Sequence, residues 1–375
     1  MKKKIAISAI NLFEGGTLSV LKDCLYSIEN SSQFEDCEFV VLVHKKKLFD
    51  QDSYKKVTFV EFPKSRKSYL YRLYYEYFYF KKFAKQYKID FWFSIHDMSP
   101  NVGSIPQAVY CHNTSPFKDV SLNDLYLQPT VFFFTLFYAF LYKINIKKNK
   151  YVVVQQLWIK NEFFKRFGLA YNHIVIAKPQ EPQIGNAITI TSLHKKEKKF
   201  IFPTYPRPFK NIEVIGEAVK ILNDEGISGY SVNISIDGSE NKYARVVLSK
   251  YGKIKHLNFI GLQPRETIYK LYADSDCLIF PSKLESWGLP ISEYKQFNKP
   301  MIVADLPYAK ETVGMYGKAK FFAPSDAKLL ANYMKMFIIS GEIQFDKTKV
   351  IEYPKPYVQD WEELLLLLLS KKNSR

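Results

Sequence analysis

Phe280-Pro-Ser-Lys-Leu-Glu-Ser-Trp-Gly-Leu-Pro-Ile-Ser-Glu293 is the stretch of this chain that decides its fold. The apolar run that leads into it, Asp276–Phe280, predicts a short buried strand, and Pro290–Phe297 predicts a helix with proline in its first turn. The turn between them offers free backbone N–H groups and the positive end of a helix dipole. Open α/β sheets bind anionic ligands at this place, outside the carboxyl end of a strand.

Two glutamates bracket this turn. Glu285 precedes the helix and Glu293 lies on its first turn, so both carboxylates can face one bound molecule. Carboxylates beside an anion-attracting helix start indicate a ligand that offers hydroxyls as well as phosphate. A nucleotide sugar offers both. Two solvated glutamates on a surface helix would have the same spacing, but the full phrase Phe-Pro-Ser-x-x-Glu-Ser-x-Gly-Leu-Pro-x-x-Glu is far more specific than the pair.

Strands and helices alternate throughout the chain. The expected strands are Lys4–Ile10, Phe39–His44, Val57–Phe62, Phe91–Ile95, Ala108–Cys111, Tyr151–Gln155 and Ile174–Ala177 in the first half, and Lys199–Pro203, Tyr230–Ile236 and Leu257–Ile260 in the second. The expected helices include Thr17–Ser31, Trp158–Phe167, Asn211–Asp224, Lys242–Tyr251 and Arg265–Ala273. This alternation predicts an α/β protein with two doubly wound, Rossmann-like parallel sheets that face each other across a cleft.

The domain boundaries follow from the same pattern. We expect a first domain over residues 1–178, a linker with two prolines over 179–198, a second domain over 199–352 and a terminal helix within 353–375. The 375 residues leave room for two domains of ordinary size, and 47% hydrophobic residues can give each a core. The four cysteines are far apart and form no metal-ligand or disulfide pattern, which predicts reduced thiols.

A net charge of +17 predicts a polyanionic partner, either nucleic acid or anionic lipid headgroups. The aromatic residues lie in apolar runs rather than among basic residues, and no nucleic-acid module is recognisable, so we expect no nucleic-acid partner. Two segments bear on the lipid alternative. Ser68–Tyr87 is an aromatic, basic helix, and Val131–Tyr142 is apolar and precedes several lysines. Both are too short for a span of about 20 residues, and each predicts either a half-buried core helix or a membrane-facing surface.

Polar residues follow two strands of the first half. Gly15 and Gly16 stand between the first strand and its helix, where backbone can approach a ligand closely. His112 leaves a strand and enters the polar loop Asn113–Ser115, which favours a functional role for its imidazole. His96 and Asp97 end another strand, and we expect a functional role for them less than for His112.

A basic loop follows the first strand of the second half. In Pro203–Asn211 two further prolines stiffen the loop that presents Arg207 and Lys210. Arginine suits bidentate contact with phosphate oxygens, and lysine supplies a compact point charge. The pair falls at a strand-to-helix turn on the side of the sheet where the opening stretch also lies, which favours phosphate binding over a solvated surface.

These motifs resemble those of retaining glycosyltransferases of family 4, which have the GT-B fold. The resemblance covers the second half well and rests in the first half on Gly15, Gly16 and His112. It implies that Arg207 and Lys210 form a diphosphate clamp and that the glycines face donor phosphate and acceptor. It also implies that a terminal helix crosses back to the first domain.

The resemblance assigns the remaining roles residue by residue. Glu285 would bind hydroxyls of the donor sugar, Glu293 the ribose, and Gly288 and Leu289 would offer backbone N–H groups. His112 would lie against the donor sugar. The catalytic residues implied are His112, Glu285, Arg207 and Lys210. The donor-binding residues implied are Gly15, Gly16, Arg207, Lys210, Asp237, Ile260, Glu285, Ser286, Trp287, Gly288, Leu289 and Glu293.

No metal or cofactor is expected. Asp274-Ser-Asp276 looks like the Asp-x-Asp metal motif of another glycosyltransferase fold, but it ends a helix and enters a buried strand, which predicts capping and turn chemistry. Fixed cations and a helix dipole can stabilise a departing nucleoside diphosphate without a metal. The family retains anomeric configuration, so no protein nucleophile is required.

The function expected is transfer of a hexose from a GDP- or UDP-sugar to a lipid-linked glycan in the synthesis of a surface polysaccharide such as O-antigen or capsule. The enzyme would work in the cytoplasm, bound peripherally to the anionic inner face of the cytoplasmic membrane. An alternative is an inactive GT-B binding module that serves as a membrane-associated scaffold. Nucleic-acid binding through the +17 charge is a third hypothesis, and it predicts a steep salt dependence of affinity.

Overall fold

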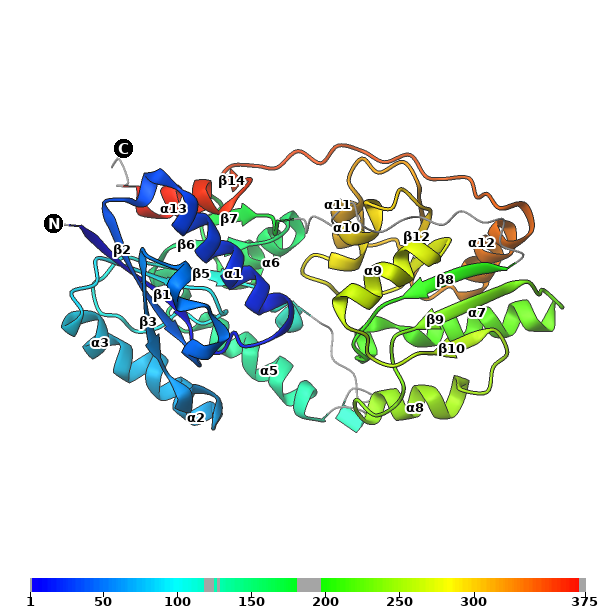
Figure 1. The fold of residues 1–375 in the computed structure, drawn as a ribbon, viewed down its shortest axis with the longest axis horizontal. Coiled ribbons are helices and arrows are strands. Elements are labelled where there is room, and N and C mark those ends of the chain that lie inside the picture. Colours follow the sequence, from blue (N-terminus) through cyan, green and yellow to red (C-terminus); the bar gives the residue numbers. More distant parts are fainter. Residues whose placement is uncertain (1, 118–124, 127–128, 181–196, 371–375) are drawn as a thin grey trace. The chain divides into compact units, whose positions relative to one another are not determined.

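The structure is a computed structural model that describes residues 2–117, 125–126, 129–180 and 197–370 (Figure 1). Its chain divides into two α/β units. The first comprises Met1–Phe117, Thr135–Gln180 and Tyr353–Arg375, and the second comprises Lys118–Phe134 and Glu181–Glu352. The division differs from the expected one for residues 118–134, which the sequence assigned to the first domain. Most of the expected linker, residues 181–196, lies outside the described residues.

The sheet of the first unit has eight parallel strands in the order β14-β7-β6-β5-β4-β1-β2-β3. The strands are β1 (Lys3–Ala9), β2 (Cys37–Val43), β3 (Val57–Glu61), β4 (Phe91–Ser94), β5 (Gln107–Cys111), β6 (Asn149–Val154), β7 (Ile174–Ala177) and β14 (Tyr357–Val358). The strand order reverses between β1 and β4, which makes the sheet doubly wound as predicted. Helices cover both of its faces, and this explains why most of its strands are almost continuously apolar.

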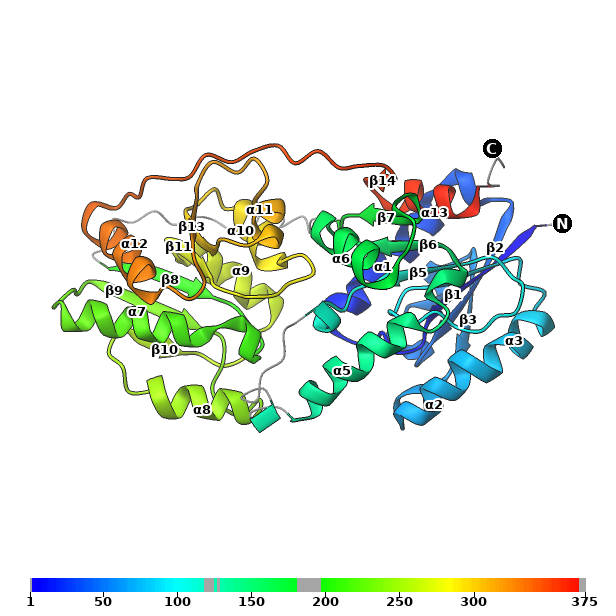
Figure 2. The same ribbon diagram turned by 180° about the vertical axis from the view of Figure 1, so that it is seen from behind.

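Two groups of helices cover the two faces of this sheet (Figures 1 and 2). Helices α1 (Gly15–Asn30) and α13 (Trp361–Leu369) share one apolar core with the strands. Helices α3 (Phe80–Gln86), α5 (Pro129–Lys143) and α6 (Leu157–Phe167) pack on the opposite face. Successive strand residues point to opposite faces, and neighbours such as Val153 and Val154 accordingly belong to different cores.

The expected helix Ser68–Tyr87 forms with an interruption. It begins as α2 (Tyr69–Tyr74), widens into a π-helical turn over Tyr75–Tyr79 and continues as α3. The side chain of Ser68 caps its start by accepting from the backbone N–H of Leu70 at 3.1 Å. The segment holds no glycine or proline that would have indicated the π turn from the sequence.

The sheet of the second unit has six parallel strands in the order β10-β9-β8-β11-β12-β13. The strands are β8 (Lys198–Phe202), β9 (Tyr230–Ile234), β10 (Leu257–Phe259), β11 (Cys277–Phe280), β12 (Met301–Ala304) and β13 (Ala319–Phe322). The helices are α7 (Ile212–Asp224), α8 (Lys242–Tyr251), α9 (Arg265–Asp274), α10 (Leu289–Lys295), α11 (Pro307–Val313) and α12 (Ala327–Ser340). The strand order reverses between β8 and β11, so this sheet is doubly wound as well.

The chain from Tyr353 onwards belongs to the first unit. Strand β14 pairs with β7, and α13 packs beside α1 (Figure 1). Leu364, Leu365 and Leu368 are buried in the core that α13 shares with α1. Part of the leucine run therefore forms the apolar face of a core helix.

Candidate functional site

The topology of the second unit selects one place on its sheet. The order reverses between β8 and β11, and ligands of doubly wound sheets bind outside the carboxyl ends of the strands at such a switch point. The loop that presents Arg207 and Lys210 leaves β8, and the turn that holds Glu285 leaves β11. The two motifs singled out in the sequence therefore meet at the switch point.

Hydrogen bonds join these two loops directly. The side-chain amide of Asn211 donates to the carbonyl oxygens of Pro281 at 3.1 Å and Pro324 at 2.7 Å. The backbone N–H of Lys283 donates to the carbonyl oxygen of Phe209 at 2.7 Å. Asn211 is buried and adopts a left-handed conformation with φ of 59°, which asparagine tolerates better than most residues. Asn211 thus fixes the position of Lys210 relative to the turn after β11.

Lys210 and Glu285 form an ion pair at the centre of this arrangement. The Lys210 Nζ lies 2.5 Å from Glu285 Oε1, and the two side chains are 17% and 14% exposed. A partly buried ion pair is less screened by salt than a surface pair. The sequence predicted a phosphate contact for the lysine and a sugar contact for the glutamate, and the structure brings the two groups together.

Arg207 has a different setting. It directly precedes the short 3₁₀ turn Pro208–Lys210, and its guanidinium lies 5.4 Å from the ring of Tyr205. The exposed ring of Tyr205 offers its π face to the cation at this distance. The guanidinium of Arg207 carries N–H groups that suit bidentate contact with an anion.

The turn after β11 ends at Gly288. This residue has φ of +91° and precedes α10, so it stands where the left-handed conformation favours glycine. Leu289 begins the helix, and Ser286 is partly exposed in the turn. The indole of Trp287 is buried and donates to Ser292 Oγ at 2.8 Å, so its side chain packs in the core.

Glu293 is the fifth residue of α10 and therefore lies on its second turn, later than expected. Its carboxylate accepts from the hydroxyls of Tyr269 at 3.3 Å and Tyr272 at 3.2 Å, and Arg265 Nη2 lies 3.3 Å away. Burial raises the pKa of Glu293, against the opposing effects of Arg265 and the two hydroxyls. Burial disfavours the charged form of a carboxyl group.

Sequence reasoning missed these three partners of Glu293, all of which lie on α9. Arg265 and Tyr269 are four residues apart on one face of the helix, and the Arg265 Nε donates to the Tyr269 hydroxyl at 2.5 Å. The spacing of Arg265 and Tyr269 in the sequence could have shown that their side chains share one face of the helix. The sequence could not have shown that α9 packs beside α10, because this contact depends on the tertiary fold.

Asp237 and Ile260 lie at the carboxyl ends of the neighbouring strands β9 and β10. The backbone N–H of Ile260 donates to the carbonyl oxygen of Ile234 at 2.9 Å, and that of Gly261 to Ile236 at 3.1 Å. The Asp237 carboxylate accepts from the backbone N–H of Ser239 at 2.9 Å, and hydrogen bonds from Ser239 lower the pKa of Asp237. The structure brings these two predicted residues to one edge of the sheet.

Gly15 and Gly16 begin α1, which follows β1 after a loop of residues 10–14 at the switch point of the first unit. Gly15 has φ of +62°, and a Cβ atom built on it would meet no heavy atom within 4 Å. The helix start is therefore accessible to a ligand at the place predicted.

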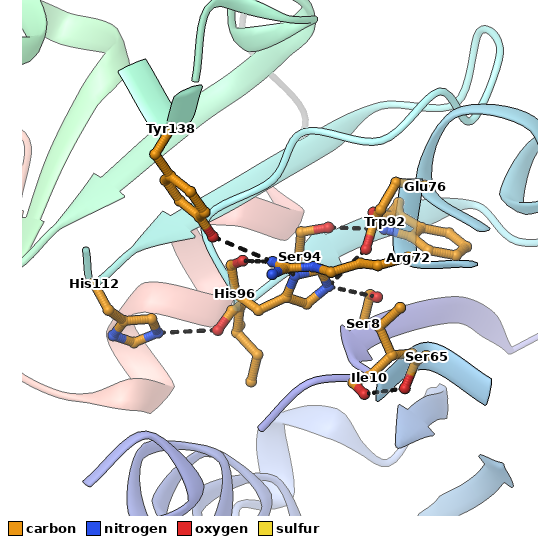
Figure 3. A network of polar contacts seen from close by, with 11 residues as sticks. Ser8, Ile10, Ser65, Arg72, Glu76, Trp92, Ser94, His96, His112 and Tyr138 are labelled. Atoms are coloured by element: carbon orange, nitrogen blue, oxygen red, sulfur yellow. Dashed lines mark hydrogen bonds and ion pairs between the residues drawn. The ribbon is translucent and has the colours of Figure 1, made fainter. Parts of the chain in front are cut away.

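His112 follows β5, in the loop next to the turn that leaves β4. Its Nε2 donates to the carbonyl oxygen of Ile95 at 3.0 Å (Figure 3). Its ring stacks on Tyr110 at a centroid distance of 4.4 Å. Because a carbonyl only accepts, Nε2 carries the proton and Nδ1 of the neutral ring is an acceptor. Burial lowers the pKa of His112, which Asp97 and the Ile95 contact oppose.

His96 is fully buried, unlike His112. Arg72 Nη2 lies 3.2 Å from its Nδ1 and donates to its carbonyl oxygen at 2.8 Å, and Ser8 Oγ lies 2.9 Å from its Nε2 (Figure 3). Burial lowers the pKa of His96 well below its usual value, and the charge of Arg72 adds to this effect. His96 is accordingly a neutral residue of the interior.

The Asp-x-Asp sequence has a structural use. The carboxylate of Asp276 accepts from the backbone N–H of Lys199 at 2.8 Å, and Asp274 pairs with the Lys199 Nζ at 2.6 Å. Within the described part of the chain, no three His, Cys, Asp or Glu side chains come close enough together to hold a metal ion. Among the same residues, no helix combines the length and apolar character needed to cross a membrane.

Comparison with known proteins agrees with this geometry. Residues 186–352 match the family Glycosyl transferases group 1. The chain is 25% identical over 232 residues to the O-antigen chain mannosyltransferase RfbU of Salmonella typhimurium, a match that covers 58% of this chain and 60% of the relative. The chain thus spans less than two thirds of the length of this curated relative.

Solved structures share the fold over nearly the whole chain. The lipopolysaccharide outer core galactosyltransferase WaaB has a TM-score of 0.63 at 15% identity, with 92% of each chain covered. The Anabaena protein HepE in complex with UDP-glucose has a TM-score of 0.62 at 15% identity, with 90% of each chain covered. This chain therefore carries a domain of the family Glycosyl transferases group 1, and its two parallel α/β units have the GT-B fold.

Proposed function

We propose that this protein is a retaining glycosyltransferase that moves a hexose from a GDP- or UDP-sugar to a lipid-linked glycan during synthesis of a surface polysaccharide such as O-antigen or capsule. The similarity to RfbU and the match to Glycosyl transferases group 1 support the reaction class. The single observation that carries the proposal is the Lys210–Glu285 pair at the switch point of the second sheet.

The chemistry follows from the charges of these groups. Negative charge develops on the phosphate oxygens as a nucleoside diphosphate departs, and cations already held in place stabilise it. Lys210 and Arg207 would supply these cations. Glu285, held by Lys210, would accept from sugar hydroxyls. The carboxylate oxygens of Glu293, which also contact side chains of α9, would accept hydrogen bonds from the ribose hydroxyls. The backbone N–H groups of Gly288 and Leu289 would add further hydrogen-bond donors.

From the first unit, His112 would contact the donor sugar as the resemblance implies. Its Nδ1 is the ring atom available to accept from a sugar hydroxyl, because Nε2 is bonded to Ile95. Gly15 and Gly16 would let phosphate or acceptor approach the start of α1 closely. Neither of these contacts requires a protein nucleophile or a metal.

The acceptor would be reached at a membrane surface. Exposed apolar side chains gather on two helices of the first unit, namely Leu70, Tyr71, Tyr74 and Phe78 on α2 and its π turn and Leu136, Phe137 and Phe140 on α5. The ring of Tyr69 contacts that of Phe137, which joins the two helices into one face. The charged residues exposed on these helices and on α3 are all lysines, and such a face suits an anionic bilayer. We propose a cytoplasmic enzyme bound peripherally in this way.

The donor proposal is tested by thermal unfolding and sugar transfer across a panel of GDP- and UDP-sugars. One nucleotide family should stabilise the protein, by about 2.7 kcal/mol at a hundredfold excess over Kd. Lys210→Ala and Arg207→Ala should abolish this stabilisation. Lys335→Ala is the matched control, since it removes a lysine from an exposed Lys–Glu pair of the same unit.

Each result has a distinct meaning. Stabilisation and transfer that both variants lose support the proposal. Stabilisation without transfer to any lipid-linked acceptor would favour the inactive scaffold. Absence of stabilisation by every nucleotide would overturn the donor site.

The membrane proposal is tested by sedimentation with vesicles. Phe78→Ser and Phe137→Ser should weaken binding to vesicles that contain anionic lipid, and neutral vesicles should bind less of the unaltered protein. Ile339→Ser, at an exposed apolar residue of α12 in the other unit, is the control. Equal binding by all three variants would contradict the assignment of this face.

A further inference from the structure

The turn Ile95–Asp97, directly after β4, is a hub of polar contacts in the first unit. It lies at the switch point, because β4 is the strand next to β1 where the order reverses. Its three residues each accept a hydrogen bond from another element. The Ile95 carbonyl accepts from the His112 ring and the His96 carbonyl accepts from Arg72 (Figure 3). The Asp97 carboxylate accepts from the loop after β5. Little was expected of Asp97 from its place in the sequence alone.

Asp97 makes the largest set of these contacts. Its Oδ1 accepts from the backbone N–H groups of His112 at 2.6 Å and Asn113 at 2.9 Å, and the hydroxyl of Tyr142 lies 2.9 Å from the same oxygen. The Tyr142 hydroxyl also lies 3.0 Å from the carbonyl oxygen of Asn113. A carboxylate that accepts from backbone N–H groups forms charge-assisted hydrogen bonds, which are stronger than neutral ones.

The backbone of Asp97 is strained in the same place. It has φ of +74°, a left-handed conformation that is uncommon for residues other than glycine. Its own N–H donates to the carbonyl oxygen of Tyr110 at 3.1 Å, so both ends of the residue are tied to β5 and its loop. Strained residues persist where the surrounding contacts determine their conformation, and they concentrate at functional sites.

The His112 ring is fixed by contacts on two sides. Ile95 accepts from Nε2 on one side, and Tyr110 stacks on the ring face, itself stacked on Trp361 of α13 at 5.6 Å. These contacts orient the ring, while Asp97 holds the backbone that carries it. Placement of a functional imidazole within tenths of an ångström requires both an oriented ring and a fixed backbone.

We propose that Asp97 is a positioning residue for His112, and that Tyr142 of α5 holds the Asp97 carboxylate in place. Asp97 acts through the backbone of His112 and Asn113 and contacts no substrate. The inference rests on the proposed function for its effect on transfer, while its effect on the His112 ring is independent of that function.

The buried cation beneath the hub supports this arrangement. Arg72 is 5% exposed, donates to the His96 carbonyl and lies 3.4 Å from the Tyr138 hydroxyl of α5 (Figure 3). Arg72 thereby holds the middle residue of the turn. Helix α5 therefore reaches the hub at two points, Tyr138 and Tyr142.

The test compares transfer by Asp97→Ala, Asp97→Asn and Tyr142→Phe. A displacement of about 1 Å can cost on the order of a hundredfold in rate, so Asp97→Ala should lower kcat by about that factor and leave the KM for the nucleotide sugar nearly unchanged. Asp97→Asn, which keeps one acceptor oxygen and the volume, should lose less and guards against a folding defect. Tyr142→Phe should fall between Asp97→Asn and the unaltered protein.

A double-mutant cycle separates positioning from general stability. In a His112→Ala background, Asp97→Ala should cause no further loss, because its route of action is gone. Tyr171→Phe is the control, since it removes a hydroxyl that bonds to Asn161 elsewhere in the first unit. Full additivity of the two losses would overturn the proposal.

The second readout is independent of activity. Nitrogen-15 NMR of labelled histidine, with His112→Ala for assignment among the six histidines, reports the tautomer of His112. The unaltered protein should show the proton on Nε2, and Asp97→Ala should give a mixture of tautomers. An unchanged His112 spectrum in both Asp97→Ala and Tyr142→Phe would refute the positioning role. If no nucleotide sugar supports transfer, the proposed function fails and this spectrum still decides the inference.

Discussion

Lys210 and Glu285 hold opposite charges 2.5 Å apart at the place where a diphosphate and a sugar are proposed to bind. An anionic phosphate that approaches Lys210 must share it with the carboxylate. The pair therefore has two roles that oppose each other: the glutamate orients the lysine, and it also competes with the leaving group for the same cation.

Glu285→Gln separates these roles. The neutral amide removes the competition, so a free nucleoside diphosphate should bind at least as tightly to the variant. Sugar transfer should fall by about a hundredfold, a loss on the scale of one electrostatic contact in a transition state. Calorimetric titration with GDP and UDP checks the first expectation, and a transfer assay checks the second. Weaker diphosphate binding by Glu285→Gln than by the unaltered protein would contradict this account.

At the scale of elements, the π turn between α2 and α3 carries the buried carboxyl of Glu76. Its Oε1 lies 3.2 Å from the Nε2 of the neutral His96, and burial raises the pKa of Glu76 to about 8 despite the opposing charge of Arg72. The folded protein therefore keeps a proton on Glu76 that the unfolded chain releases at lower pH.

Because the pKa of Glu76 differs between the folded and unfolded states, its contribution to the stability of the protein depends on pH. A carboxyl group whose folded pKa is raised contributes stability that is fully present below its unfolded pKa and is lost as pH rises through the folded value. The contribution of Glu76 to the unfolding free energy should fall between pH 5 and about pH 8, whereas the lowered pKa values of His96 and His112 act in the opposite direction. Glu76→Gln should remove this fall from the curve of melting temperature against pH, whereas the exposed Glu266→Gln should leave the curve unchanged. Parallel curves for Glu76→Gln and the unaltered protein would show that Glu76 is ionised when folded.

At the scale of the whole molecule, the chain leaves the first unit, builds the second and returns. Its last helix, α13, completes a core that also holds β1, β2 and α1. Residues more than three hundred positions apart in sequence thus support one another, as in the contact between Lys3 Nζ and the carbonyl oxygen of Leu369 at 2.9 Å. The aromatic stack from Trp361 through Tyr110 to His112 connects the same helix to the proposed site.

Truncation of a buried leucine of α13 should therefore weaken the first unit as a whole. Leu365→Ala should cost about 2–5 kcal/mol of its unfolding free energy, and Leu366→Ala, on the same helix but 41% exposed, should cost much less. Hydrogen exchange would measure this as lost protection in β1 and β2 with unchanged protection in β8 and β11. Equal losses in both sheets would show that the units unfold together.

The fold class, most of the strands and helices, and the two motifs that follow β8 and β11 could all be predicted from the sequence alone. These features are local: apolar runs bounded by turn residues predict strands, and a strand–turn–helix phrase with glycine and proline predicts a ligand-binding turn. The sequence also singled out His112 from its place after a strand. The orientation of the His112 ring could not be predicted from the sequence.

Only the tertiary structure decided which groups meet. Lys210 and Glu285 are 75 residues apart, and the partners of Glu293 come from α9. Asp97 contacts His112, which follows the neighbouring strand β5, and Tyr142, which lies on α5. The apolar helix α5 proved to bury Tyr138, Leu141 and Tyr142 and to expose Leu136, Phe137 and Phe140, a division that its nearly uniform composition concealed. Contacts of this kind depend on strand order and helix packing, which no local pattern encodes.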